Sequence, residues 1–225
     1  MKLNRCLYGL KKSPRAFWKF MVKKLDFCGL KQSNLDTCLF IGYTMIALMY
    51  VYNILMWSTE YQNMIDLKKL LITEGVDLEE ENDAAGFLGL QLTKTEVGST
   101  MMTQEGLIDR IIEDMGLDVD NITPKTTQCM KSILTKDLDG DPCSEYFAFA
   151  SIVEMLMYLA VHSCPGIYYS ASQVARFKLC PKRSHEAGLK LIGRYLFGTR
   201  NKGLIINPTH DLNIDAYYDA DFPGI

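Results

Sequence analysis

The spacing of apolar residues predicts two helices with paired strands between them in the N-terminal part of the chain. Residues 14–28 place apolar side chains at helical spacing, and Gly29 supplies a natural end. Residues 58–73 repeat that spacing behind a Ser-Thr pair of the kind that caps helices. Residues 38–41 and 45–57 are uncharged and rich in aliphatic and aromatic residues. They therefore predict two buried, paired strands.

Further along, the pattern changes from strands to helices. An acidic loop over 74–86 precedes a strand hairpin that turns at Gly98, and Ser184 is the expected N-cap of the last helix. In chain order the expected elements are strands at 87–93 and 100–103, a helix at 104–115, an irregular segment at 117–144, helices at 145–162, 167–178 and 184–197, and strands at 204–206 and 212–218. This mixture predicts the α+β class.

The distribution of charge along the chain adds a feature that the pattern of apolar residues does not show. With 48% apolar and 23% charged residues, the chain has the composition of a globular protein. Residues 1–24 carry eight Lys or Arg and no acid, and residues 176–202 carry eight against one acid, whereas 60–154 hold 20 acids and seven bases. Two basic ends around an acidic middle can face phosphates. Ordinary solvated helix faces are an equally good interpretation.

Two further patterns bear on the compartment. The seven cysteines are scattered without a Cys-x-x-Cys pair, which fits reduced thiols in an intracellular protein, and no secretory signal is evident in the basic first 24 residues. Residues 39–57 lack charge over nearly the length of a membrane span. Because Gly42-Tyr43-Thr44 divides this stretch into runs of strand length, a hairpin is preferred to a membrane helix.

Several short blocks resemble, in the same order, the polymerase region of copia-type retrotransposon reverse transcriptases. The first two are the block from Leu7 to Arg15, with its Tyr-Gly-Leu-Lys, and Tyr50-Val51-Tyr52-Asn53, which is similar to Tyr-Val-Asp-Asp. The later blocks are Phe87–Leu92, Met102–Gly116, Tyr158–Ser170, Glu186–Thr199 and Tyr218–Phe222. Any one block is weak, but their shared order over nearly the whole chain makes the resemblance specific.

The resemblance implies a partial reverse-transcriptase palm, a helical thumb and connection, and a truncated ribonuclease H-like start. The implied domains are a palm and thumb fragment at 1–116, an irregular connector at 117–144, a helical connection segment at 145–200 and the start of the ribonuclease H-like domain at 201–225. The palm sheet would lack its upstream strand and leave an exposed edge. One departure is Glu154, whose charge in an apolar helix face destabilises the fold unless it reaches solvent or a partner.

In this family, polymerase chemistry uses two Mg²⁺ ions held by aspartates. The resemblance places two of these aspartates at Tyr52 and Asn53, and a third on a strand upstream of Leu7, ahead of the first residue given. A phenol and a neutral amide cannot replace two carboxylates as Mg²⁺ ligands. We therefore expect no metal, no cofactor and no intact catalytic residue in this chain, with Tyr52 and Asn53 forming an ordinary hairpin tip.

Other site residues follow from the resemblance alone. It implies nucleotide and template contacts at Gly9, Lys11, Lys12 and Arg15, for which solvated loop residues are the equally good alternative. It implies a primer-grip-like turn at Phe87, Leu88 and Gly89. Asp219 is similar to the first acid of ribonuclease H, although one strand-end acid cannot carry that reaction alone.

Three functions remain open on the sequence. The first is a catalytically inactive fragment of an RNA-directed DNA polymerase, for which an RNA or DNA template-primer is a weak partner. The second is a non-enzymatic nucleic-acid-binding module that uses the basic segments 2–24 and 176–202. The third, less favoured, is membrane association through 39–57. The pattern does not determine the oligomeric state.

Overall fold

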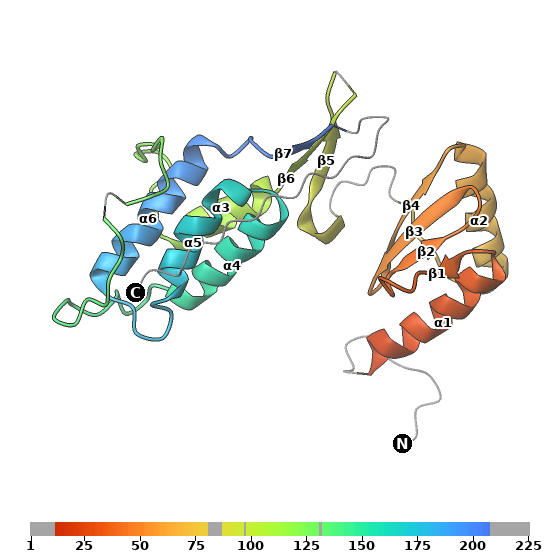
Figure 1. Ribbon diagram of the computed structural model, residues 1–225, viewed down its shortest axis with the longest axis horizontal. Helices are drawn as coiled ribbons and strands as arrows, with labels where there is room; N and C mark the ends of the chain where they lie inside the picture. The colour runs from red at the N-terminus through yellow and green to blue at the C-terminus, as the bar shows by residue number, and fades with distance from the viewer. Residues whose placement is uncertain (1–11, 81–86, 97, 131, 208–225) are drawn as a thin grey trace. The chain divides into compact units, whose positions relative to one another are not determined.

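The computed structural model describes residues 12–80, 87–96, 98–130 and 132–207, with the side chain of Leu88 left out (Figure 1). Gly9, Lys11, Asp219 and the expected strand at 212–218 lie outside these residues. The chain divides into two compact units, Met1–Phe87 (unit 1) and Leu88–Ile225 (unit 2). Helices and antiparallel sheets occur in both, as the α+β class predicts.

Unit 1 is a four-stranded antiparallel sheet with two helices on one face. Its elements are α1 (Ser13–Phe27), β1 (Lys31–Gln32), β2 (Leu39–Ile41), β3 (Met45–Tyr50), β4 (Asn53–Ser58) and α2 (Tyr61–Thr73), and the strand order is β1-β2-β3-β4. The core joins Met21 of α1 and Leu71 of α2 to Phe40, Ala47 and Met49 of the sheet. Burial of these apolar side chains is the main stabilising contribution in the unit.

Unit 2 combines a helical core with a small sheet. Its elements are β5 (Gln91–Lys94), β6 (Thr100–Thr103), α3 (Glu105–Asp114), α4 (Phe149–His162), a 3₁₀ turn η2 (Pro165–Ile167), α5 (Tyr168–Ala175), α6 (Arg183–Gly198) and β7 (Leu204–Ile206). Buried side chains of α3, α4, α5 and α6 form one apolar cluster. The sheet has the order β5-β6-β7, so β7, which lies in the region expected to start the ribonuclease H-like domain, pairs with β6.

The predicted strands needed four corrections. The stretch 45–57 is two strands joined at Val51-Tyr52, and β1 was missed. Residues 87–89 form a 3₁₀ turn, η1 (Phe87–Gly89), so the following strand begins only at Gln91. The strands of unit 1, which were expected to be buried, are buried on one face only, because α1 and α2 cover that face alone. Ile46 and Trp57 on the other face are exposed.

Helix ends also differ from the prediction. The helix expected from 145 begins at Phe149, and α5 ends at Ala175. Lys182 is the N-cap of α6, while the Ser184 hydroxyl donates to Asp137. The N-cap of α2 is Glu60, whose N–H donates to the Ser58 hydroxyl.

The irregular segment and the uncharged stretch agree with their predictions. The described residues of 117–148, which leave out position 131, contain no helix or strand apart from one bridge between Pro142 and Lys182. Residues 39–57 form β2, β3 and most of β4. Among the described residues, no helix has the length and apolar character that crossing a membrane requires. Glu154 is exposed and pairs with Lys178, so its charge avoids the expected cost of burial.

Candidate functional site

The β3–β4 hairpin brings Tyr52 and Asn53, the positions expected to correspond to the family's two aspartates, to its tip. Tyr50 pairs with Asn53, which leaves Val51 and Tyr52 as a two-residue turn. Val51 has a φ of 52°, and it is the one non-glycine residue with positive φ among those described. A positive φ at the first turn position alone is the pattern of a type II′ turn, where glycine is favoured. The turn is therefore strained by a β-branched side chain.

The Tyr52 side chain is occupied in packing. Its ring lies 5.1 Å from that of Phe17, centroid to centroid, with the planes tilted by 51°. This contact holds the hairpin tip against the first turns of α1, since edge and tilted contacts between aromatic rings are favourable. Asn53 is exposed and starts β4. The tip therefore presents a packed phenol and one neutral amide.

These groups do not fit a magnesium site. Mg²⁺ is bound in proteins through carboxylate oxygens and water in near-octahedral geometry. A phenol packed against Phe17 and a single amide oxygen offer no carboxylate. Within the described ranges, no three His, Cys, Asp or Glu side chains lie close enough together to hold a metal ion.

Helix α1 carries a row of cations beside this hairpin. Lys12, Arg15, Lys19 and Lys23, which we call the α1 basic row, recur at helical spacing and are exposed. None of the four forms an ion pair with another described residue. Of the four expected nucleotide-contacting residues, the structure thus places Lys12 and Arg15 on one exposed helix side.

The second basic segment, residues 176–202, differs from the α1 basic row, because acidic residues of unit 2 already pair with several of its cations. Lys178 pairs with Glu154, Lys190 with Glu186, and Arg200 with Asp109. The Lys182 ammonium donates to the carbonyl of Gly140 at 2.7 Å. Internal pairing leaves fewer cations of 176–202 for an external phosphate.

The expected primer-grip-like residues form the turn η1. Gly89 has a φ of 71°, and Phe87 is partly buried. Because L-residues with side chains rarely adopt this φ, glycine suits the position. The turn leads into β5, which pairs with β6 in unit 2.

Sequence reasoning missed a buried carboxylate on α6. Glu186 is 6% exposed at its side chain, and its Oε2 accepts hydrogen bonds from the Ser144 N–H (3.0 Å) and hydroxyl (2.7 Å), while its Oε1 accepts one from Lys190 (2.7 Å). Burial alone would raise its pKa, but the hydrogen bonds from Lys190 and Ser144 prevail and lower the pKa to about 2. The sequence did contain a signal for the ion pair, because Lys190 follows Glu186 by one helical turn.

The neighbouring His185 also links α6 to the irregular segment before α4, through the carbonyl of Thr135. Its Nδ1 accepts from the Lys182 N–H at 3.0 Å, and its Nε2 lies 3.0 Å from the carbonyl of Thr135. Its ring stacks on Phe177 with centroids 4.0 Å apart. Glu186, His185 and Ser184 therefore tie residues 135–144 to α6, which is a structural role.

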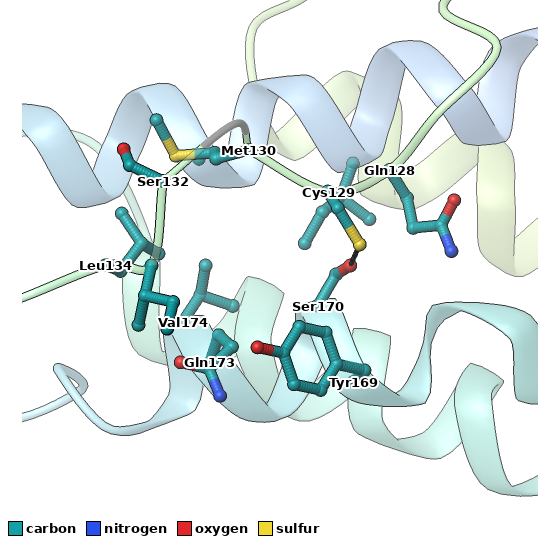
Figure 2. A pocket seen from close by; sticks show the side chains of 12 residues that line it. Gln128, Cys129, Met130, Ser132, Leu134, Tyr169, Ser170, Gln173 and Val174 are labelled. Carbon is teal, nitrogen blue, oxygen red and sulfur yellow. Dashed lines mark hydrogen bonds between the residues drawn. The ribbon is translucent and has the colours of Figure 1, made fainter. Parts of the chain in front are cut away.

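A pocket opens between α5, α6 and residues 128–130 and 132–134 (Figure 2). It encloses about 100 Å³. Figure 2 shows the Cys129 thiol next to the Ser170 hydroxyl, 3.1 Å apart, at one end of a mainly apolar lining. The lining contains no Asp, Glu, His, Lys or Arg among the described residues. The described lining therefore offers no carboxylate, imidazole or cationic side chain, and its titratable groups are the Cys129 thiol and the Tyr169 phenol.

Comparison with known proteins identifies the family to which the chain belongs. Residues 1–131 match the family described as reverse transcriptase (RNA-dependent DNA polymerase). The match covers more than half of the chain, so the chain belongs to the reverse transcriptase family.

The particular relatives are polyproteins of copia-type plant retrotransposons. The chain is 28% identical over 99% of its length to the retrovirus-related Pol polyproteins from transposons RE1 and RE2 of Arabidopsis thaliana, and 26% identical over 99% to that from transposon TNT 1-94 of Nicotiana tabacum. It spans only 15 to 17% of the length of these polyproteins. No solved structure matches the chain.

Proposed function

We propose that this chain is a catalytically inactive segment of a copia-type reverse transcriptase. The hairpin tip carries the proposal, since the positions equivalent to the two metal-binding aspartates hold Tyr52 and Asn53. The Tyr52 ring packs on Phe17 and Asn53 begins β4, so both residues serve the hairpin. Without carboxylates there, two Mg²⁺ ions have no ligands from this turn.

Primer extension tests the proposal directly. The purified chain is incubated with a primed RNA template, deoxynucleotides and either Mg²⁺ or Mn²⁺, beside a heat-killed sample. We expect incorporation at the level of the heat-killed sample. Template-dependent incorporation above that level would overturn the proposal.

Measurement of metal binding tests whether the missing carboxylates at Tyr52 and Asn53 are the reason for the expected inactivity. The variant Tyr52→Asp/Asn53→Asp places a carboxylate at both positions, and Tyr52→Asn, which leaves Asn53 unchanged, is the uncharged match. Binding of Mn²⁺, followed by electron paramagnetic resonance, should be stronger in the Asp variant than in both the parent and the Asn variant. Equal Mn²⁺ binding by all three would mean that Tyr52 and Asn53 are not the reason for inactivity.

A second candidate function is binding of nucleic acid without catalysis, and the α1 basic row favours it. Four exposed cations that form no ion pair with another described residue lie along one helix, whereas much of the basic charge in 176–202 is paired internally. Unpaired cations release counterions from phosphates on binding, and already paired ones do so less effectively. We therefore assign binding to α1 rather than to both basic segments.

Salt titration tests this candidate. Fluorescence anisotropy of a labelled RNA–DNA hybrid gives the affinity at several salt concentrations. Four phosphate contacts predict a slope of log affinity on log salt of about −3 to −4. A slope near zero, or no binding at low salt, argues against it.

A further inference from the structure

The pocket between α5 and α6 contains a lining residue without a side chain. Gly188 of α6 lies there, and a Cβ added to it would come within 3.3 Å of the Leu134 Cδ1 and the Met130 Sδ and within 3.5 Å of the Val174 Cγ1. All three neighbours also line the pocket, so a side chain at Gly188 would enter the space between them. The glycine therefore helps to keep about 100 Å³ open beside the helical core.

Apolar side chains gather in solvent beside this space. Ile133 is 68% exposed, Tyr169 is 56% exposed and Met130 is 38% exposed, and all three line the pocket. The buried Ile192 of α6 continues the apolar lining inwards. Exposed apolar side chains around a concave surface are typical of a ligand-binding site.

One buried polar group in the lining has spare hydrogen-bonding capacity. Ser170 is 5% exposed, and its hydroxyl lies 3.1 Å from the Cys129 thiol (Figure 2). A thiol is a weak donor and a weak acceptor, whereas a hydroxyl offers one donor and two acceptor positions. A ligand that carries a hydroxyl group can therefore form a stronger hydrogen bond with Ser170 than Cys129 does.

The two amide side chains of the lining already bond within the chain. The Gln128 Nε2 donates to the carbonyl of Gly166 at 2.8 Å. The Gln173 Oε1 accepts a hydrogen bond from Arg176 at 3.1 Å. Among the buried lining residues, Ser170 is therefore the polar group that a ligand would meet.

Size and charge narrow the class of ligand. Sites for drug-sized ligands usually measure about 300–1,000 Å³, and an enclosed apolar cavity of about 150 Å³ holds benzene. A space of about 100 Å³ that opens to solvent therefore takes a single six-membered ring that stays partly exposed. None of the described lining residues is charged, so a charged ligand would lose hydration there without an opposite charge.

We propose that this pocket binds a small uncharged aromatic molecule, one ring in size, that carries one hydroxyl group. The ring lies among Leu134, Val174 and Ile192, and the hydroxyl bonds to Ser170. The site is separate from the hairpin tip and from the α1 basic row, because its described lining residues all belong to unit 2.

Titration of the full chain with phenol tests the proposal. Nuclear magnetic resonance follows the methyl groups of Leu134, Val174 and Ile192, and we expect saturable shifts as phenol is added. Benzoate has a ring of the same size with a negative charge, and its dissociation constant should be at least tenfold higher than that of phenol. The proposal is wrong if phenol gives no saturable shift of these methyl groups, or if benzoate binds as tightly as phenol.

Ser170→Ala tests the polar contact. The variant should raise the dissociation constant of phenol about fivefold to tenfold, because the ligand hydroxyl loses its partner. Toluene has a methyl group in place of the hydroxyl, so its dissociation constant should change little. An equal change for both ligands would mean that Ser170 acts through packing alone, and the proposal would be overturned.

Gly188→Ala tests occupation of the space itself. The added methyl group should raise the dissociation constant of phenol about tenfold or more by overpacking the pocket. Gly106→Ala in α3 is the matched control, because its Cβ meets nothing within 4 Å and it does not line the pocket. Circular dichroism verifies that the variants are folded. Equal weakening by the two variants would show that phenol binds elsewhere, which contradicts the proposal.

Discussion

At the scale of single residues, Val51 shows that the hairpin tip keeps its turn at a conformational cost. Its φ of 52° lies in the left-handed region, where a β-branched side chain is disfavoured by about 1–2 kcal/mol. The pairing of Tyr50 with Asn53 and the contact of Tyr52 with Phe17 offset this cost. Packing around the turn, rather than the turn residues, therefore selects its geometry.

Replacing Val51 with glycine should remove this strain. Val51→Gly is expected to raise the free energy of unfolding of unit 1 by about 1 kcal/mol, after allowance for the flexibility that glycine adds to the unfolded chain. Both tryptophans of the chain, Trp18 and Trp57, lie in unit 1, so tryptophan fluorescence during urea unfolding reports on this unit alone.

The control for this variant is Tyr43→Gly at the neighbouring β2–β3 turn. Tyr43 is fully exposed and has a negative φ, so glycine relieves no strain there. The control should be neutral or destabilising. A gain in stability as large as that of Val51→Gly would contradict the strain argument.

Glu186 is the second residue whose environment has a measurable consequence. Its pKa is about 2 in the folded chain and near 4.5 when exposed. Because the folded pKa is the lower one, the carboxylate stabilises unit 2 above pH 4.5, and this stability is lost as pH falls from 4.5 towards 2. The full contribution corresponds to about 3 kcal/mol.

Glu186→Gln should therefore flatten the acid side of the stability profile of unit 2. Hydrogen exchange of α6 amides between pH 6 and 3, corrected for intrinsic rates, measures the local stability. Glu154→Gln is the matched control, because Glu154 pairs with Lys178 at an exposed site. Such surface pairs contribute about 0–1 kcal/mol, so little change is expected. An unchanged profile in Glu186→Gln would refute the assignment.

At the scale of elements, α6 packs closely on the end of α3. A Cβ added at Gly193 would overlap the Met115 sulfur and lie 2.8 Å from the Leu117 Cδ1. Met115 is buried, so its side chain has little room to move. The glycine therefore allows a close helix approach at the expense of helix propensity.

Two Gly→Ala variants separate packing from propensity. Gly106 lies in α3, and a Cβ there meets nothing within 4 Å. Gly106→Ala should stabilise unit 2 by about 0.5–1 kcal/mol through propensity, whereas Gly193→Ala should destabilise it by about 1–2 kcal/mol through overpacking. Thermal unfolding followed by circular dichroism compares them. Stabilisation by both variants would show that α3 and α6 are not closely packed at Gly193.

At the scale of the whole molecule, the charge count alone is misleading. The two basic segments carry eight cations each. The structure pairs several of those in 176–202 with acids from elsewhere in unit 2, such as Glu154 and Asp109. On α1 the basic row forms no ion pair with the rest of the described chain, so the two segments should differ in nucleic-acid binding despite their equal numbers of cations.

Neutralising two cations in each segment tests this difference. Lys19→Gln/Lys23→Gln should weaken binding of a single-stranded oligonucleotide and make the salt slope smaller by about 1.4, at roughly 0.7 per lost phosphate contact. Lys178→Gln/Arg200→Gln removes the same net charge from paired sites and should change the slope little. Equal effects of both variants would show that net charge, rather than the α1 basic row, governs binding.

Local patterns predicted most helices because helix formation depends on spacing within a few turns. The residues 14–28 and 104–115 illustrate this, as both helices lie within one or two residues of the expected bounds. The apolar pattern predicted 45–57 as one strand, although the resemblance placed a hairpin tip at Tyr52 and Asn53. Val51-Tyr52 is not a typical turn sequence, and only the pairing of β3 with β4 defines the turn. The cap of α6 was misplaced because Ser184 bonds to the distant Asp137.

The sequence by itself determined the family, the α+β class and the absence of carboxylates at Tyr52 and Asn53, since these depend on residue identity and local order. Tertiary structure decided which charges are compensated. Glu154 and Glu186 are both acids in helices, yet one lies in solvent beside Lys178 and the other is buried among Ser144 and Lys190. Lys190 is four residues from Glu186, so helical spacing indicates that pair, but Lys178 is 24 residues from Glu154 and Ser144 is 42 residues from Glu186. Only folding brings these distant partners within hydrogen-bond distance, so no local pattern could assign them.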